Sequence, residues 1–167
     1  MTIVSYYDNR VSNWTIGEFD ESKVFRDRFG RFSRKTTIEE KQAKMNVVRL
    51  DFHSDNYLPP LNIEEQERFN IPDVSVRIKK ERIEGNLKHF DVNGYDDDYI
   101  VGSALYNPTM FLPAKRPNAY HLISKIGKDK NSLVLPDIEY NKNDNFLDVI
   151  HYFYIDDNKI SQLKRNK

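Results

Sequence analysis

The longest apolar run of the chain covers residues 146–155 and alternates between two largely apolar faces. One face combines aliphatic and aromatic residues with a histidine: Leu147, Val149, His151, Phe153 and Ile155. The other face is also rich in aromatic and β-branched side chains, which is typical of a strand covered on both sides. We therefore predict that this run is the central strand of the core, with Leu147, Val149, Phe153 and Ile155 buried and His151 hydrogen-bonded inside.

Two stretches carry helix-start signals. Either Thr36 or Thr37 is followed three residues later by a glutamate, which is the spacing of a capping box and predicts a helix to about Met45. Asn62 and Glu65 repeat this spacing before a second, shorter helix, which Pro72 keeps from continuing.

The rest of the pattern is β-like. Residues 74–78 alternate as a half-exposed strand, and residues 132–140 form a strand that Pro136 would restrict to a sheet edge. Further strands are expected at residues 2–7, 14–19, 47–52, 87–92 and 99–101, with residues 160–163 pairing back on the central strand. The predicted fold class is α+β, a mostly antiparallel sheet with two short helices and long proline-containing loops.

The chain of 167 residues is expected to be a single domain, with residues 21–35 as a basic and aromatic arm. Residues 107–119 contain three prolines and little periodicity, so we expect an extended loop without regular structure. Loops of this length in a compact domain tend to serve binding. We expect contact with a partner through Met110, Phe111 and Leu112, since three large apolar residues are costly to leave in water.

Composition excludes several classes of protein. The 26 basic and 26 acidic residues give no overall field to attract nucleic acid or membrane, and the absence of cysteine excludes disulfides and thiol chemistry. No window reaches the length of a transmembrane helix, and the N-terminus lacks a signal-peptide pattern, so we expect a soluble intracellular protein. Scarce alanine with abundant Asn, Asp, Lys, Ile and Tyr is typical of AT-rich coding, as in many phages and some protists.

The segment from Lys23 to Lys35 has the one notable local charge asymmetry. As an assembly arm, it would insert its phenylalanines into a neighbouring subunit; these are Phe25, Phe29 and Phe32. As a nucleic-acid arm, it would bind phosphates through its arginines while the phenylalanines stack on bases; these arginines are Arg26, Arg28, Arg31 and Arg34. The neutral overall charge favours the first interpretation.

No motif predicts catalysis, a metal or a cofactor. Residues 91–98 have the oxygen-rich composition of a calcium loop but lack its twelve-residue spacing and closing glutamate. Asp137 and Glu139 would share a strand face, but Lys142 lies in a predicted turn rather than on the strand that a metal-dependent nuclease requires. The four histidines are isolated in the sequence.

These patterns together predict a non-enzymatic structural or interaction subunit of a large assembly, with a phage or viral particle as the expected setting. Its partners would be other protein subunits of the assembly. The alternative is a nucleic-acid-associated protein that binds through the Arg/Phe segment, residues 23–35. An enzyme ranks third.

Overall fold

The computed structural model divides into two compact units, Met1–Lys35 and Thr36–Lys167. It describes residues 35–87, 96–137 and 143–166, together with four short strands nearer the N-terminus. These strands are β1 (Thr2–Val4), β2 (Asn13–Thr15), β3 (Val24–Arg26) and β4 (Phe32–Arg34). β1 pairs with β2 and β3 pairs with β4, both antiparallel, so the described part of the Arg/Phe segment is a pair of strands.

The second unit is built on a six-stranded sheet in the order β5-β6-β10-β9-β8-β7. Its strands are β5 (Asn56–Leu58), β6 (Val76–Ile78), β7 (Met110–Pro113), β8 (Tyr120–Lys125), β9 (Lys130–Pro136) and β10 (Leu147–Asp156). Only the β6–β10 pair is parallel among these strands. The predicted α+β class with a mostly antiparallel sheet is confirmed.

The described residues form five helices rather than the two we expected. They are α1 (Ile38–Asn46), α2 (Ile63–Phe69), α3 (Lys80–Leu87), α4 (Asp97–Tyr106) and α5 (Asp157–Arg165). α1 and α2 start where the sequence predicts. Thr37 caps α1 in a complete capping box, because Glu40 N donates to Thr37 Oγ1 at 3.2 Å and Thr37 N donates to the Glu40 carboxylate at 2.9 Å. None of the five helices is both long and apolar enough to cross a membrane.

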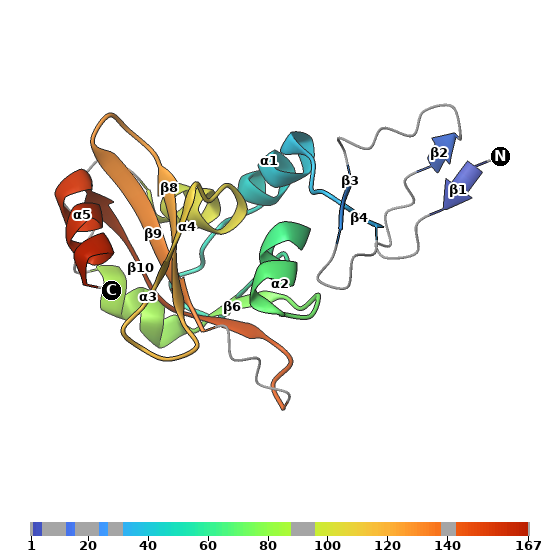
Figure 1. Ribbon diagram of the computed structural model, residues 1–167. Coiled ribbons are helices and arrows are strands. Elements are labelled where there is room, and N and C mark those ends of the chain that lie inside the picture. Colours follow the sequence, from blue (N-terminus) through green and yellow to red (C-terminus); the bar gives the residue numbers. More distant parts are fainter. Residues whose placement is uncertain are drawn as a thin grey trace. The chain divides into compact units, whose positions relative to one another are not determined.

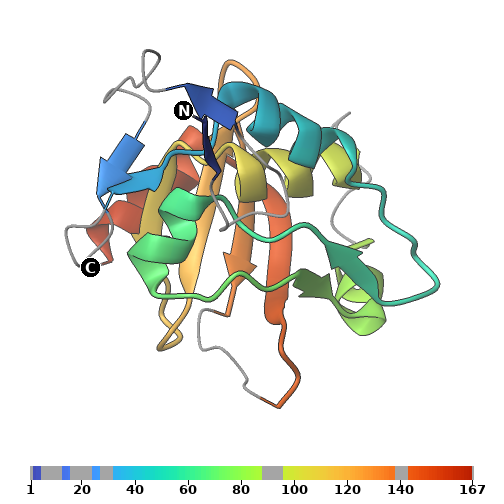
Figure 2. The ribbon, with the colours of Figure 1, turned by 90° about the vertical axis from the view of Figure 1, so that its right-hand side faces the viewer.

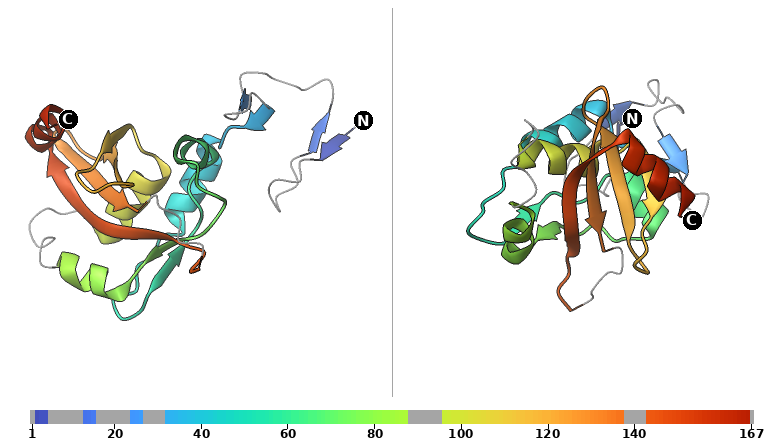
Figure 3. Two further views of the ribbon diagram at one scale, coloured as in Figure 1. Left: turned by 60° about the horizontal axis from the view of Figure 1, so that its bottom comes forward. Right: turned by 90° about the vertical axis from the view of Figure 1, so that its left-hand side faces the viewer.

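Helices cover the sheet on both faces, as Figures 1 and 2 show. α4 lies against one face, with α1 packed on its outer side, and the main core fills this layer. α5 covers the opposite face, seen in front of the strands in the right panel of Figure 3. A smaller cluster lies beneath it and contains Leu112, Ile123, Leu133, Ile155 and Ile160.

β10 is an inner strand, as predicted, but its two faces are not those of a strict alternation. The register against β9 shifts between Val149 and His151, so that an extra residue bulges out of the ladder. Leu147 and Val149 face the main core, whereas Ile155 faces the α5 side. As a result, Tyr152 is fully buried in the main core, and Phe153, which we expected to be buried, is half-buried on the α5 side.

His151 is exposed at the same bulge rather than buried in the core. Its Nδ1 lies 3.2 Å from the Asn86 side-chain oxygen at the end of α3. The predicted hydrogen bond is therefore present, but it joins an exposed histidine to the buried Asn86, because the bulge turns His151 away from the main core.

Two predicted strands are wrong for identifiable reasons. Residues 47–52 form no strand because side chains occupy their backbone donors: Leu50 N donates to Asp98 and Asp51 N donates to Asn56. Residues 99–101 lie inside α4, whose start is set by Asp96: its side chain accepts from Tyr99 N at 2.8 Å.

Two further predictions that were based on prolines are wrong. Residues 107–119 are not an unstructured loop, because Met110–Pro113 pairs with β8 as the edge strand β7. β9 lies inside the sheet rather than at an edge, and Pro136 is tolerated there as its last residue.

Residues 160–163, expected to pair back on the central strand, belong to α5.

A buried hydrogen bond joins β10 to α4. The Tyr152 hydroxyl donates to Asp97 Oδ2 at 2.8 Å, and both residues are buried. Burial raises the pKa of the Asp97 carboxyl, and the Tyr152 hydrogen bond opposes this shift. The bond thereby satisfies a polar group that would otherwise be buried at a cost.

Replacing Tyr152 by Phe should lower the free energy of unfolding by about 1–3 kcal/mol, because Asp97 then stays buried without its donor. Tyr154→Phe is the matched control on the same strand, where the half-buried ring lies near the Lys130 amine. We expect that control to change stability by less than about 0.5 kcal/mol. Urea unfolding at pH 7 measures both, and equal losses in the two variants would contradict the role assigned to Tyr152.

Candidate interaction site between helices α1 and α4

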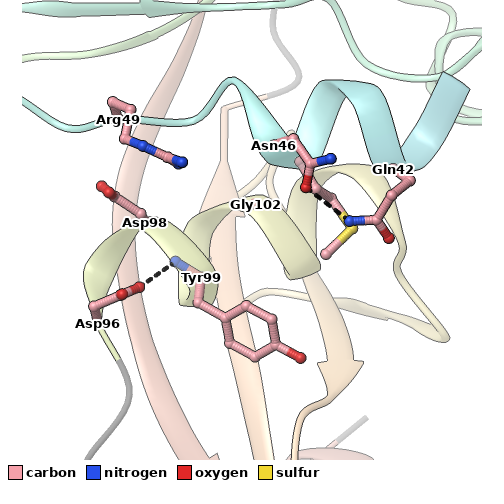
Figure 4. Close-up of a pocket in the computed structure, with 8 residues that line it drawn as sticks. Gln42, Asn46, Arg49, Asp96, Asp98, Tyr99 and Gly102 are labelled. Carbon is pink, nitrogen blue, oxygen red and sulfur yellow. Dashed lines mark hydrogen bonds between the residues drawn. The ribbon is translucent and has the colours of Figure 1, made fainter.

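A hollow of about 400 Å³ opens to solvent between α1 and the start of α4 (Figure 4). Eight residues line it: Gln42, Met45, Asn46, Arg49, Asp96, Asp98, Tyr99 and Gly102. Four come from α1 and the turn after it, and four come from α4 and its cap. Two segments about fifty residues apart in the sequence therefore form one site.

The walls of the hollow are held by local hydrogen bonds. On α4, Asp96 caps the helix, while Asp98 Oδ1 accepts from Leu50 N at 2.8 Å and so fixes the turn that follows α1. On α1, Gln42 Nε2 donates to Asn46 Oδ1 at 2.9 Å, one turn further along. These bonds orient carboxylate and amide groups at the rim before any ligand binds.

Gly102 allows the close approach of the two helices. A β-carbon at this position would lie 3.4 Å from the Met45 carbonyl oxygen and 3.5 Å from Val48 Cγ2. These distances are ordinary contacts, so the space beside Gly102 suits a methyl group and no more. A larger side chain would have to displace the α1 backbone.

The chemistry of the lining suits recognition of a protein surface. It offers amides, carboxylates, a guanidinium, a thioether and a phenol, a mixture of polar and apolar groups that is common at protein interfaces. Within the described residues, no three His, Cys, Asp or Glu side chains are grouped to hold a metal ion. Arg49 is exposed and forms no ion pair with a described residue.

Apolar side chains extend this site. Ile38 is 82% exposed and lies one turn before Gln42, on the same stripe of α1 that lines the hollow. Tyr99 is 44% exposed at the rim of the hollow. Exposed aromatic and aliphatic side chains beside a polar depression often serve as anchor residues at protein interfaces.

The Arg/Phe segment belongs to the other compact unit. Phe25 and Arg26 belong to β3, and Phe32 and Arg34 belong to β4, with Arg26 opposite Phe32 in the register. Three predicted site residues lie outside the described residues: Arg28, Phe29 and Arg31. Binding of protein or nucleic acid by this segment stays a prediction.

The apolar residues predicted to meet a partner at 110–112 contact their own domain. Leu112 is 4% exposed within the cluster beneath α5, and Met110 packs against the same cluster. Phe111 packs on Phe69 with ring centroids 5.7 Å apart, and the Arg68 guanidinium lies 4.5 Å from its ring centroid. The fold already uses this apolar surface, and a partner contact here stays a prediction.

The oxygen-rich stretch at 91–98 is described only from Asp96 onward. There the three aspartates have separate structural roles: Asp96 caps α4, Asp97 binds Tyr152 and Asp98 binds the Leu50 amide. Asp137 forms an ion pair with Arg116 at 2.9 Å, while residues 138–142 lie outside the described part.

The fold is that of a small α+β domain with a solvent-open hollow between α1 and α4. Residues 34–167 match large polyvalent protein-associated domain 13, and the chain belongs to this family. The membership suggests a large polyvalent, phage-like protein context. No curated protein and no solved structure matches the chain.

The two glycines in helices provide a test of the α1–α4 contact. Gly85→Ala in α3 should raise the free energy of unfolding by about 0.5–1 kcal/mol, because its β-carbon meets nothing within 4 Å. Gly102→Leu should instead lower it by about 1–3 kcal/mol, because the side chain would push against Met45 and Val48. Thermal and urea unfolding measure both changes. A stabilised Gly102→Leu variant would show that α1 is not packed on α4 as described.

Proposed function

We propose that the chain is a non-enzymatic interaction subunit of a large, phage-like assembly, and that the surface around the α1–α4 hollow binds a protein partner. The observation that carries this proposal is the combination of highly exposed Ile38 and partly exposed Tyr99 with the prearranged polar rim. Burial of this apolar surface by a partner would stabilise the complex by roughly 25 cal/mol per Å² of apolar area. Membership in a family of large polyvalent protein-associated domains supports the phage-like setting of this proposal.

Replacing Ile38 and Tyr99 together by Ser should abolish binding of the partner and leave the domain folded, because Ile38 is 82% exposed and Tyr99, at 44%, lies outside the buried core. The matched control is Val47→Ser. Val47 is 59% exposed but lies nine residues after Ile38, about half a turn away around the α1 axis. The tagged chain would be recovered from cells that express it naturally, and the mass of the native complex measured by light scattering.

We expect the wild type and the Val47→Ser control to be part of a complex heavier than the single chain, and the double variant to be a folded monomer. A wild-type chain that is monomeric under all conditions would refute the assembly proposal. A double variant that stays in the complex would leave the assembly in place and exclude this surface as its contact.

The Arg/Phe segment separates the proposal from its alternative, a nucleic-acid-associated protein. One variant replaces Phe25, Phe29 and Phe32 by Ser, and a second replaces the arginines by Gln at Arg26, Arg28, Arg31 and Arg34. We expect the phenylalanine variant to weaken partner association and the arginine variant to have little effect, as for apolar anchors with a charged rim. Both variants are assayed for association and for single-stranded nucleic-acid binding across salt concentrations. Tight binding of nucleic acid that falls steeply with salt and is lost only in the arginine variant would favour the alternative.

A further inference from the structure

Three buried oxygen atoms at the start of α2 have no hydrogen-bond donor, and they belong to Asn62, Glu64 and Glu65. Asn62, the N-cap, is completely buried, and its Nδ2 donates to the Tyr106 carbonyl at 3.0 Å while its Oδ1 has no partner. Glu65, three residues on, is 4% exposed, and its Oε2 has no partner. An ionised carboxylate and an amide oxygen can only accept hydrogen bonds, so neither can satisfy the other.

The spacing of Asn62 and Glu65 places both at the start of α2. In the N-cap-x-x-Glu arrangement, the side chain at the third helical position turns back toward the cap. Here the Asn62 side chain donates to Tyr106 and gives α2 no side-chain cap. Its effect on Glu65 is to favour the ionised carboxylate and so to lower the pKa of that group.

The charged groups around Glu65 do not supply a counter-ion dedicated to it. From α1, Lys41 forms an ion pair with Glu64 at 3.5 Å, and the Lys44 amine donates to the carbonyls of Pro60 and Leu61. On α2 itself, Glu64 repels a second negative charge. From the end of α4, the Tyr106 hydroxyl donates to the Pro59 carbonyl.

We propose that Glu65 is held as a neutral carboxylic acid in the folded domain, because its carboxyl group is buried and one of its oxygens has no donor, and that loss of the acid proton loosens the junction of α1, α2 and α4. Protonation removes a charge that burial disfavours and converts the Glu65 carboxyl into a hydrogen-bond donor. The junction is then a pH-sensitive element of the fold, independent of the function proposed for the α1–α4 surface.

The pKa of Glu65 agrees with this arrangement. Burial, and then the neighbouring Glu64, raise the pKa of Glu65 from 4.5 to about 7, while Lys41 and the Asn62 side chain oppose the shift. Because the pKa is higher in the folded chain, its contribution to stability is complete below pH 4.5 and is lost as the pH rises through about 7. Between these values the folding equilibrium constant should fall nearly tenfold per pH unit.

The test compares the full-length wild type with Glu65→Gln, which mimics the neutral acid, and with Glu64→Gln as the control on the same turn. Urea unfolding is measured from pH 4.5 to pH 8.5. We expect the ratio of the Glu65→Gln folding constant to that of the wild type to rise across the range and to level off above about pH 7. Glu64→Gln should keep most of the wild-type pH dependence. Identical pH dependence in the wild type and Glu65→Gln would overturn the proposal.

A second measurement does not rely on the stability of any variant. Infrared difference spectra of the folded wild type at pH 6 should show the carbonyl band of a protonated carboxyl, and this band should be absent in Glu65→Gln and disappear from the wild type on titration to pH 8.5. A wild type without such a band at pH 6 would show that Glu65 is ionised and would refute the proposal.

Discussion

The register shift in β10 is the constraint on which the rest of the second unit depends. Without the extra residue between Val149 and His151, strict alternation would leave Tyr152 facing away from the main core. With it, Tyr152 enters that core and binds Asp97, which fixes the first turn of α4 on the sheet. The same turn carries Asp98, which binds Leu50 N and fixes the segment after α1. The candidate interaction site is therefore positioned by a bulge on the central strand.

Buried charge also links the strands near the other end of β10. Arg77 of β6 and Asp148 of β10 lie opposite each other in the parallel pair, and the guanidinium forms two hydrogen bonds to that carboxylate at 2.6 and 2.8 Å. Asp144 adds a third at 3.0 Å, and the guanidinium lies 4.8 Å from the centroid of the Phe146 ring. These carboxylates raise the pKa of Arg77 and keep its charge paired.

The sequence predicted those parts of the fold that depend on local interactions. The capping box at Thr37 and Glu40 and the helix after Asn62 need only contacts within one turn, and both were correctly placed. The errors occur where distant residues compete with local propensity. Val48 and Leu50 favour a strand, but Asp98, nearly fifty residues later, takes the Leu50 amide. The bulge in β10 likewise depends on its pairing with β9, so a period of two could not reveal it.

The candidate site was missed for a related reason. Its α4 half was hidden because residues 99–101 were interpreted as a strand, although an N-cap aspartate followed by two more acidic residues is itself a helix-start signal that could have been recognised. Gln42 was placed on a predicted helix and Arg49 on a predicted strand, and no sequence pattern indicated that they line the same hollow as Tyr99. By contrast, a binding role was predicted for residues 110–112 because three large apolar residues follow one another there. The contact of Phe111 with Phe69 depends on tertiary packing, and no local pattern could predict it.

Buried polar groups have hydrogen-bond partners in two parts of the domain, whereas the Glu65 carboxyl at the start of α2 has an oxygen without one. Arg77 has hydrogen-bond partners from two aspartates, and the Tyr152 hydroxyl donates to Asp97, so the polar groups at these two junctions are paired. At the start of α2 the lysines of α1 are engaged elsewhere and Glu65 is left with an unsatisfied oxygen. Desolvation favours the neutral form of such a carboxyl. Protonation can therefore adjust the α1–α2–α4 junction while the central sheet, held by paired charges, keeps its structure.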